Sequence, residues 1–253
     1  MGGHPCRMEK ISPWAKKNNL FLIEDCAETC GSEYKNKKIG TWGDISCFSF
    51  EEKKIISTGD GGMICLNNKK DYEKIKSLSF HGWNTDPWTR HNKSFEKKNR
   101  PNKHWNYEIV NLGYKYNMND FLASVGLVQL KKLNSLNKKR ANILKMYLDG
   151  IKNFKNIKPT FPYILKKSSY WLFSVKTKYR DELVDFLKSN GISTAVHFVP
   201  LPLHKLFKKY NRNVKNSLNI WKEIVSLPFF PDLRKKEINF ILRCLKQFDE
   251  RIK

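Results

Sequence analysis

The sequence predicts an α/β protein, and three observations support this. Residues 8–18 have apolar side chains at helical spacing and lead at once into a short apolar run at 20–23, which is half of a repeating unit of strand and helix. A second apolar run, at 45–50, ends in polar residues as the first one does. The C-terminal part again alternates strand-like runs with amphipathic ones. Strands that alternate with helices are typical of an open sheet covered by helices.

The first half of the chain is expected to hold short strands separated by turns. We place strands at 20–23, 45–50 and 63–66, a hairpin or loop at 33–38, and a glycine turn at 59–62. The expected helices are at 71–78, at 119–133 with Asn117 or Asn119 as its cap, and at 140–151. Residues 81–106 have no clear periodicity and contain two prolines, which predicts a long loop.

A polar, proline-containing passage at 152–167 marks the predicted domain boundary. The prediction is a larger domain at 1–151 and a compact α+β domain at 152–253. In the second domain we expect strands at 170–177 and 192–198, and helices at 181–189, 214–225 and 235–248. Gly191 is expected to close the first of these helices.

Composition limits the class of protein. The 253 residues include 48 Lys and Arg against 24 Asp and Glu, a formal charge of +24. Most of the basic residues are lysines spread along the whole chain, which favours a solvated surface over a nucleic-acid-binding face. The six cysteines form no C-x-x-C pair, so we expect reduced thiols and no four-ligand zinc site. No apolar run has the length of a membrane span and the first residues lack a signal-peptide core, which predicts a soluble, cytoplasmic protein.

Charged side chains follow two of the predicted strands. Glu24 and Asp25 come directly after the first apolar run, and the segment from Glu51 to Lys54 comes directly after the second. In open α/β sheets, ligands bind at the edge where the strands end. An acid and a lysine there suit a cofactor with a cationic ring nitrogen and an aldehyde, which describes pyridoxal phosphate.

Five motifs occur in a fixed order and identify a family. They are E-D-C-A-E at 24–28, F-S-F-x-x-x-K-x-x-x-x-G-D-G-G at 48–62, L-G-Y-K-Y-N-M-N-D at 112–120, V-G-L-V-Q-L-K-K-L at 125–133 and V-H-F-V-P-L-P-L-H at 196–204. With them the sequence resembles the DegT/DnrJ/StrS family of nucleotide-sugar aminotransferases over essentially its whole length. The resemblance implies the type I, aspartate aminotransferase-like fold of pyridoxal phosphate-dependent transferases. It also implies a homodimer that moves an amino group, usually from glutamate, to a nucleotide-linked keto-deoxy sugar in polysaccharide biosynthesis.

The resemblance gives the two charged residues their roles. Lys54 matches the Schiff-base lysine of the family, and its neighbour Lys53 is the alternative. Lys54 would hold the cofactor and, once released by the substrate amine, would transfer protons. Asp25 matches the carboxylate that faces the pyridine nitrogen and keeps it protonated. Outside this motif, Lys54 would be read as a surface charge and Asp25 as a turn residue.

Three neighbouring residues match further cofactor contacts in the family. Ala27 matches a small residue that lies under the ring, and Glu28 takes a position near the ring hydroxyl that is more often glutamine. Ser49 matches a hydroxyl that reaches the cofactor phosphate.

Four residues match positions farther along the chain. Lys115 and Asn117 stand where the family delivers a polar residue from the partner subunit towards the phosphate, although either could be a helix-entry residue. His197 and His204 match a segment near the mouth of the substrate site. Either histidine could equally be a packed or surface residue.

The sequence departs from the family pattern in one respect, and this leaves several interpretations of its function open. Members begin with a segment, roughly a third of their length, that carries a phosphate-binding turn at a helix N-terminus and an aromatic residue that stacks on the ring, and this sequence starts after that segment. We therefore expect a free sheet edge, an exposed apolar face and weak cofactor binding by the chain alone. Three interpretations stay open: part of an active aminotransferase, an inactive relic, or a basic polyanion-binding protein that keeps the fold. A sugar dehydratase is disfavoured, since those members replace the lysine with histidine.

Overall fold

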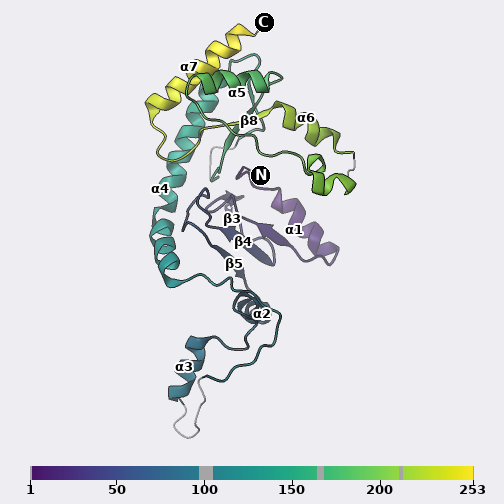
Figure 1. The fold of residues 1–253 in the computed structure, drawn as a ribbon, viewed down its shortest axis with the longest axis vertical. Coiled ribbons are helices and arrows are strands. Elements are labelled where there is room, and N and C mark those ends of the chain that lie inside the picture. Colours follow the sequence, from purple (N-terminus) through teal and green to yellow (C-terminus); the bar gives the residue numbers. More distant parts are fainter. Residues whose placement is uncertain (1, 97–104, 164–167, 211–212, 253) are drawn as a thin grey trace.

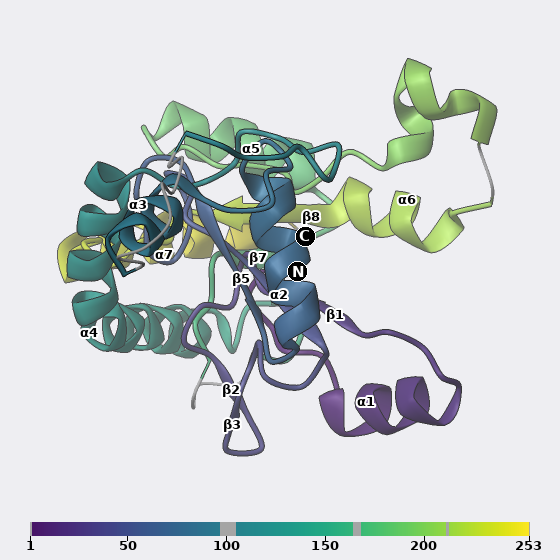
Figure 2. The ribbon, with the colours of Figure 1, turned by 90° about the horizontal axis from the view of Figure 1, so that it is seen from below.

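The computed structural model describes residues 2–96, 105–163, 168–210 and 213–252. The molecule is elongated, with helices α2 (Lys69–Ser79) and α3 (Pro87–Glu96) at one end and α7 (Lys235–Arg251) at the other (Figure 1). The long helix α4 (Asp120–Ile151) runs along one side between the two ends. Seen from below, α2 lies in front of the strands (Figure 2).

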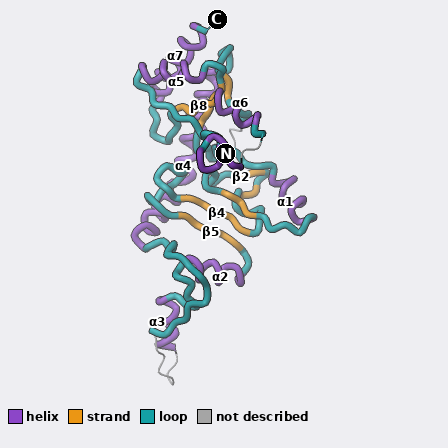
Figure 3. Tube along the Cα trace, turned by 45° about the vertical axis from the view of Figure 1, so that its right-hand side comes forward, coloured by secondary structure: helices purple, strands orange, loops and turns teal. Residues whose placement is uncertain are grey.

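A three-stranded sheet lies in the middle of the molecule (Figure 3). Its order is β1 (Ile23–Asp25), β4 (Ile45–Ser49), β5 (Gly62–Leu66); β1 and β4 are parallel, and β4 and β5 are antiparallel. Helix α1 (Met8–Lys17) precedes β1. Among the described residues, β1 pairs with β4 alone, and its edge is bordered by the exposed side chains of Leu20, Phe21 and Ile23.

The first strand begins later than the apolar run predicted. The main chain of Leu22 is bound by Asp44, whose carboxylate accepts from the Leu22 N–H at 2.8 Å. The Leu22 carbonyl also accepts from the Asp44 N–H at 2.9 Å. These contacts fix residues 20–22 as the entry to the strand, and the regular ladder starts at Ile23.

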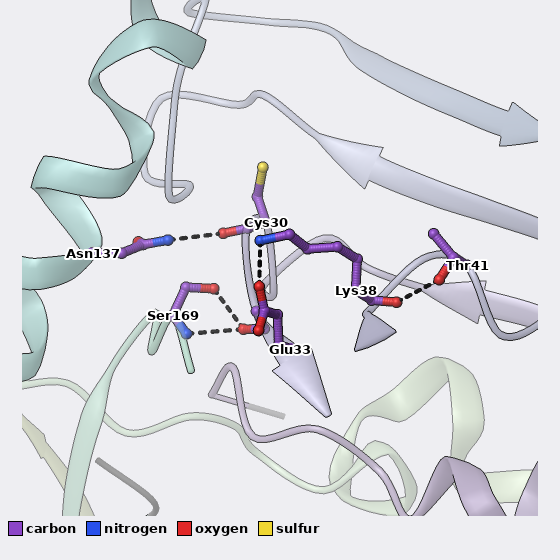
Figure 4. Close-up of polar contacts among 7 residues, drawn as sticks. Cys30, Glu33, Lys38, Thr41, Asn137 and Ser169 are labelled. Atoms are coloured by element: carbon purple, nitrogen blue, oxygen red, sulfur yellow. Dashed lines mark hydrogen bonds and ion pairs between the residues drawn. The ribbon is translucent and has the colours of Figure 1, made fainter. Parts of the chain in front are cut away.

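The predicted hairpin is present as β2 (Glu33–Tyr34) and β3 (Lys37–Lys38). Figure 4 shows how this region joins the C-terminal half of the chain. The Ser32 hydroxyl accepts from the Ser169 N–H at 2.8 Å, and Asn137 on α4 donates its amide N–H to the Cys30 carbonyl at 3.2 Å. Residues far apart in sequence thus hold the hairpin against α4.

The segment predicted as a long loop contains a helix. Helix α3 (Pro87–Glu96) has proline in its first turn, and the carboxylate of Asp86 accepts from the Thr89 N–H at 2.9 Å. The sequence of α3 is mostly polar, so the spacing of apolar residues did not predict this helix. Residues 97–104 of the predicted loop lie outside the described residues.

Helix α4 is a single helix, where the sequence predicted two. It begins after Asn119, whose side chain accepts from the Leu122 N–H at 2.9 Å, so Asn119 and not Asn117 is the cap. Residues 134–139 form the stretch between the two predicted helices. It holds neither glycine nor proline, and nothing in it interrupts the backbone ladder.

The C-terminal part contains a second sheet of antiparallel strands, ordered β6 (Lys158–Pro159), β7 (Phe173–Lys176), β8 (Ile224–Leu227). Strand β8 was missed: the sequence predicted a helix through 225, but α6 (Lys215–Glu223) ends where four buried residues begin. The predicted strand at 192–198 is reduced to one bridge between Ala195 and Ser226.

The helices of this part follow the predictions closely. Helix α5 (Arg180–Ser189) ends before Gly191, which has a φ of 72°, the left-handed conformation expected of a glycine after a helix. Two short 3₁₀ helices, η1 (Leu201–Leu203) and η2 (Lys205–Tyr210), lead towards α6. Helix α7 (Lys235–Arg251) closes the chain and extends three residues beyond the predicted end.

Two buried clusters form the core. The larger joins α4, α5, α7, β7 and β8, with Leu144, Tyr147, Phe173, Leu183 and Leu245 all fully buried. The smaller consists of Ile55, Ile56 and Leu133 with their partly buried neighbours. Helix α4 supplies residues to both clusters, and its share of the larger one starts at Ile143, ahead of the predicted boundary after 151. The division into 1–151 and 152–253 stays a prediction, and residues 164–167 of the boundary passage lie outside the described residues.

Within the described parts of the chain, no helix combines the length and the apolar character that crossing a membrane requires.

Candidate active site

Two cavities meet at Lys54. The first, which we name the β1 cavity, measures about 660 Å³ and is lined by Asp25, Ala27, Glu28, Lys54 and Phe198 among others. The second, the Trp171 cavity, measures about 510 Å³ and is lined by Lys54, Trp171, Arg140 and His197 among others. Lys54 lines both cavities, so its amine can serve either space.

Lys54 is held by the turn that follows β4. Its N–H donates to the Glu51 carbonyl at 3.0 Å, and its Nζ lies 4.7 Å from the centre of the Trp171 ring. The next two residues, Ile55 and Ile56, are buried and fix the segment on its other side. Lys53 lines only the Trp171 cavity and points to solvent, where its Nζ lies 3.4 Å from the Glu52 carboxylate. Lys54 is therefore the better placed of the two lysines.

The E-D-C-A-E motif forms one wall of the β1 cavity. Asp25 is the last residue of β1, and its carboxylate is exposed apart from accepting the Ala27 N–H at 3.1 Å. The Glu28 carboxylate accepts from the Gly2 N–H at 2.5 Å. Between them, Cys26 is buried, and burial raises the pKa of its thiol to about 12. Cys26 is thus a packing residue with a neutral thiol.

Glu24 anchors this wall. Its buried carboxylate accepts from the backbone N–H groups of Gly40 at 2.9 Å, Trp42 at 2.6 Å and Gly43 at 2.8 Å. Three N–H donors to one carboxylate satisfy a buried charge without a cation. Glu24 therefore ties the loop at 40–43 to β1 directly beside Asp25.

A chain of contacts connects Lys54 to the C-terminal sheet. The Trp171 Nε1–H donates to the Lys53 carbonyl at 2.6 Å, and the Trp171 ring meets the His197 ring at 5.4 Å between centres. His197 Nδ1 and the Ser226 hydroxyl of β8 are 2.9 Å apart. Burial lowers the pKa of His197, with Glu28 as a smaller opposing influence, so the imidazole is neutral at pH 7.

The other predicted residues lie elsewhere. Ser49 ends β4, and its hydroxyl accepts from the Glu51 N–H at 3.4 Å. Lys115 and Asn117 lie before α4, where the Lys115 Nζ donates to the Asn117 side-chain oxygen at 2.5 Å. His204 is exposed after η1. None of these four lines the β1 cavity or the Trp171 cavity as the structure describes them.

The residues of the β1 cavity suit pyridoxal phosphate. A carboxylate can face a protonated ring nitrogen, a primary amine can react with an aldehyde, and the small Ala27 leaves room between Asp25 and Lys54. Ser49, at the end of the neighbouring strand, can donate a hydroxyl to a phosphate oxygen. The donor set therefore matches the ring and the aldehyde of the cofactor.

The sequence argument assigned no role to three residues at the site: Glu24, Trp171 and Arg140. Arg140 carried a readable signal, because it stands at helical spacing with Leu144, Tyr147 and Ile151 on the apolar face of α4. A cation on such a face is unusual and marks a residue with a specific partner. Glu24 and Trp171 gave no such signal, since their partners come from distant parts of the chain.

Comparison with known proteins identifies the family. The model of the DegT/DnrJ/EryC1/StrS aminotransferase family matches residues 1–246. GDP-perosamine synthase of Escherichia coli O157:H7 is 32% identical over 97% of this chain and 63% of its own length. UDP-4-amino-4,6-dideoxy-N-acetyl-beta-L-altrosamine transaminase of Campylobacter jejuni is 32% identical over 100% of this chain and 65% of its own.

A solved structure agrees with these relatives. PseC of Helicobacter pylori, an aminotransferase involved in the biosynthesis of pseudoaminic acid, superimposes with a TM-score of 0.88 at 25% identity. The match covers 99% of this chain and 65% of PseC, so the chain spans somewhat less than two thirds of that protein's length. The fold is that of the sugar aminotransferases, and the chain belongs to the DegT/DnrJ/EryC1/StrS aminotransferase family.

Proposed function

We propose that this chain carries the catalytic lysine of a pyridoxal phosphate-dependent aminotransferase that moves an amino group from glutamate to a nucleotide-linked keto-deoxy sugar. The observation that carries the proposal is that Asp25, at the end of β1, and Lys54, in the turn after the neighbouring parallel strand β4, line one cavity with Ala27. Membership of the aminotransferase family supports the reaction class. The names of the relatives support a nucleotide-linked sugar as acceptor.

Lys54 is the proposed catalytic residue. Pyridoxal phosphate, when bound, supplies an aldehyde that condenses with amines and a ring that withdraws electrons from the neighbouring carbon. The Lys54 amine would hold that aldehyde at rest. Once a substrate amine takes its place, the free Lys54 Nζ would accept a proton from the substrate carbon and return it to the cofactor side.

The remaining cofactor residues would orient and polarise the ring. Asp25 would keep the ring nitrogen protonated, because a carboxylate close to a cationic nitrogen favours the charged form. Ala27 would leave space for the ring, Glu28 would lie near the ring hydroxyl, and Ser49 would donate to the phosphate. All four lie on β1, on β4 or in the turn that follows β1.

The two histidines would lie on the substrate side. His197 is neutral and lines the Trp171 cavity, so its ring can exchange hydrogen bonds with a sugar hydroxyl. His204 is exposed in the same segment, beyond the cavity.

We propose a homodimer as the working assembly. Exposed apolar side chains are concentrated before α4 and on its first turns, which is typical of a protein interface. They are Trp105, Tyr107, Ile109, Val110, Leu112, Tyr114, Tyr116, Phe121, Leu127, Val128 and Leu130. Lys115 and Asn117 lie within this surface, where a second copy could receive them against the cofactor phosphate.

Covalent labelling of the site tests the proposal. Purified protein is mixed with less than one equivalent of pyridoxal phosphate and reduced with borohydride, which fixes the cofactor to the amine that it has condensed with. Peptide mapping by mass spectrometry then locates the label. We expect it on Lys54, despite the many surface lysines, because among the described residues Lys54 is the lysine that lines a cavity with Asp25.

Two variants and one assay complete the test. In Lys54→Ala, the peptide that contains position 54 should carry no label. In Lys53→Ala, one residue away, that peptide should still be labelled. Release of 2-oxoglutarate from glutamate, in the presence of a nucleotide-linked keto-deoxy sugar, measures the transfer. A label scattered over surface lysines with no preference for Lys54 would support an inactive relic instead.

A further inference from the structure

Arg140 is a buried cation without a counter-charge. It is only 7% exposed, and it takes part in no ion pair among the described residues. One guanidinium nitrogen, Nη2, donates to the Ile55 carbonyl at 3.2 Å, and the buried Nη1 has no hydrogen-bond partner in the described structure. Burial lowers the pKa of Arg140 to about 10. A buried charge of this kind is costly unless an anion binds to it.

Among the charged residues that line the Trp171 cavity, cations outnumber acids. Arg140, Lys53 and Lys54 are its cations, and its one acid, Glu52, is exposed and pairs with Lys53. Hydroxyls of Ser193 and Thr194 line the same space. The cavity of about 510 Å³ is large enough for an amino acid. Its one strongly buried charge is that of Arg140, which lies on one wall.

We propose that the Trp171 cavity is a carboxylate-binding subsite for the amino-acid donor, with Arg140 as the residue that binds the carboxylate. A guanidinium presents N–H donors that match a carboxylate, and the buried Nη1 has no hydrogen-bond partner in the described structure. Lys54 lines the same cavity, so a donor held by Arg140 is close to the amine that carries the cofactor. The hydroxyls of Ser193 and Thr194 can donate to the second carboxylate of a dicarboxylic donor.

The identity of the ligand as an amino-acid donor rests on the proposed function. The binding of a carboxylate by Arg140 does not, and it can be measured on the protein without cofactor. The competing explanation is that Arg140 only ties the Ile55 carbonyl to α4. A purely structural arginine would leave the protein without affinity for a small dicarboxylate.

Isothermal titration calorimetry with glutarate tests the subsite. Glutarate has the two carboxylates of glutamate and no amine, so it cannot react with a cofactor. We expect Arg140→Lys, which keeps the charge and can still reach the Ile55 carbonyl, to weaken glutarate binding about tenfold or more through loss of the paired donors. Arg140→Met should abolish binding. Lys132→Met removes an exposed cation from the same helix and should leave binding unchanged.

A second variant avoids any effect on the core. Ser193 is exposed at the cavity, and Ser193→Glu would introduce a carboxylate that competes for Arg140. We expect this variant to keep the circular dichroism spectrum and the unfolding midpoint and to lose glutarate binding. If Arg140→Met does not fold, the glutarate affinity of Ser193→Glu tests the subsite in its place.

The outcomes separate this proposal from the proposed function. Equal glutarate binding in all variants, or no binding to the unaltered protein, overturns the subsite whether or not Lys54 takes up the cofactor. Inorganic phosphate that binds as tightly as glutarate also overturns it, since the site would then be a general anion site. Arg140-dependent glutarate binding supports the subsite even where labelling of Lys54 fails.

Discussion

The Nζ of Lys54 lies 4.7 Å from the centre of the Trp171 ring, and the same indole donates its N–H to the carbonyl of Lys53 at 2.6 Å. One side chain from the C-terminal half thus contacts both the backbone and the amine of the turn that carries the proposed catalytic residue. An ammonium over an indole gains roughly 0.5 to 2 kcal/mol, depending on its exposure. Trp171 therefore positions Lys54 and is not only a packing residue.

The Trp171→Phe variant should lower the free energy of unfolding by about 0.5 to 1.5 kcal/mol, because it keeps a ring but loses the hydrogen bond to Lys53. Urea unfolding followed by circular dichroism measures the change. Trp14→Phe, at a residue that is 60% exposed, is the matched control and should stay within about 0.5 kcal/mol. Equal stability of the two variants would show that the indole N–H contributes nothing.

Replacing Glu24 with glutamine should destabilise the protein by about 1.5 to 3 kcal/mol. The amide supplies one acceptor oxygen where the carboxylate supplies two, and the loop at 40–43 presents three N–H donors. Thermal unfolding measures the loss. Glu52→Gln removes an exposed carboxylate and should change the midpoint little. If Glu24→Gln shifted the unfolding midpoint as little as the control, the Glu24 carboxylate would not be needed to hold the loop at 40–43.

Asp25→Asn tests the proposed role of Asp25 as the partner of the ring nitrogen. The variant keeps the size of the side chain and can still accept the Ala27 N–H, so the fold should be unchanged. Loss of a charged hydrogen bond of about 1.5 to 3 kcal/mol corresponds to a rate of amino transfer roughly 10- to 150-fold lower. The release of 2-oxoglutarate measures this. Asp44→Asn, immediately before β4, is the control and should transfer at the original rate.

His197 should make stability depend on pH below neutrality. Burial lowers its pKa in the folded protein below the ordinary value near 6.5, so the unfolded chain binds more protons as the pH falls below that value. The free energy of unfolding should therefore decrease on acidification from about pH 6.5 down to the folded pKa. Urea titrations at a series of pH values should show a shallower decrease for His197→Asn. His204→Asn, at an exposed histidine, should follow the unaltered protein.

The elements that the sequence predicted well have a local cause. Helix α5 with Gly191 after it, helix α7 and strand β4 each depend on apolar spacing and on a terminal residue within the same segment. The errors occurred where local spacing is ambiguous. The four buried residues of β8 follow α6 without a break, and their pairing with β7 decides their conformation. Similarly, residues 134–139 stay helical because α4 is packed on either side of them, at Leu133 and from Ile143 onward.

The candidate site could be predicted in part. Asp25, Ala27, Glu28 and Lys54 form a recognisable pattern because each ends a strand or lies in the turn after one, and the structure brings these four to one cavity. Trp171 could not be found in this way, because its contacts with Lys53 and Lys54 span more than a hundred residues. The assignment of catalytic and cofactor-binding roles stays a prediction until the variants are measured.

Helix α4 places Leu133 in one buried cluster and Leu144 in the other, with Arg140 between them. A helix with no break cannot release one cluster without losing support for the other. We therefore infer that the two parts of the chain melt together, and that the amide protons of Leu133 and Leu144 exchange with solvent through the same global opening. The turn at 51–54, which is joined to α4 through Ile55, would be protected to the same extent as the C-terminal core.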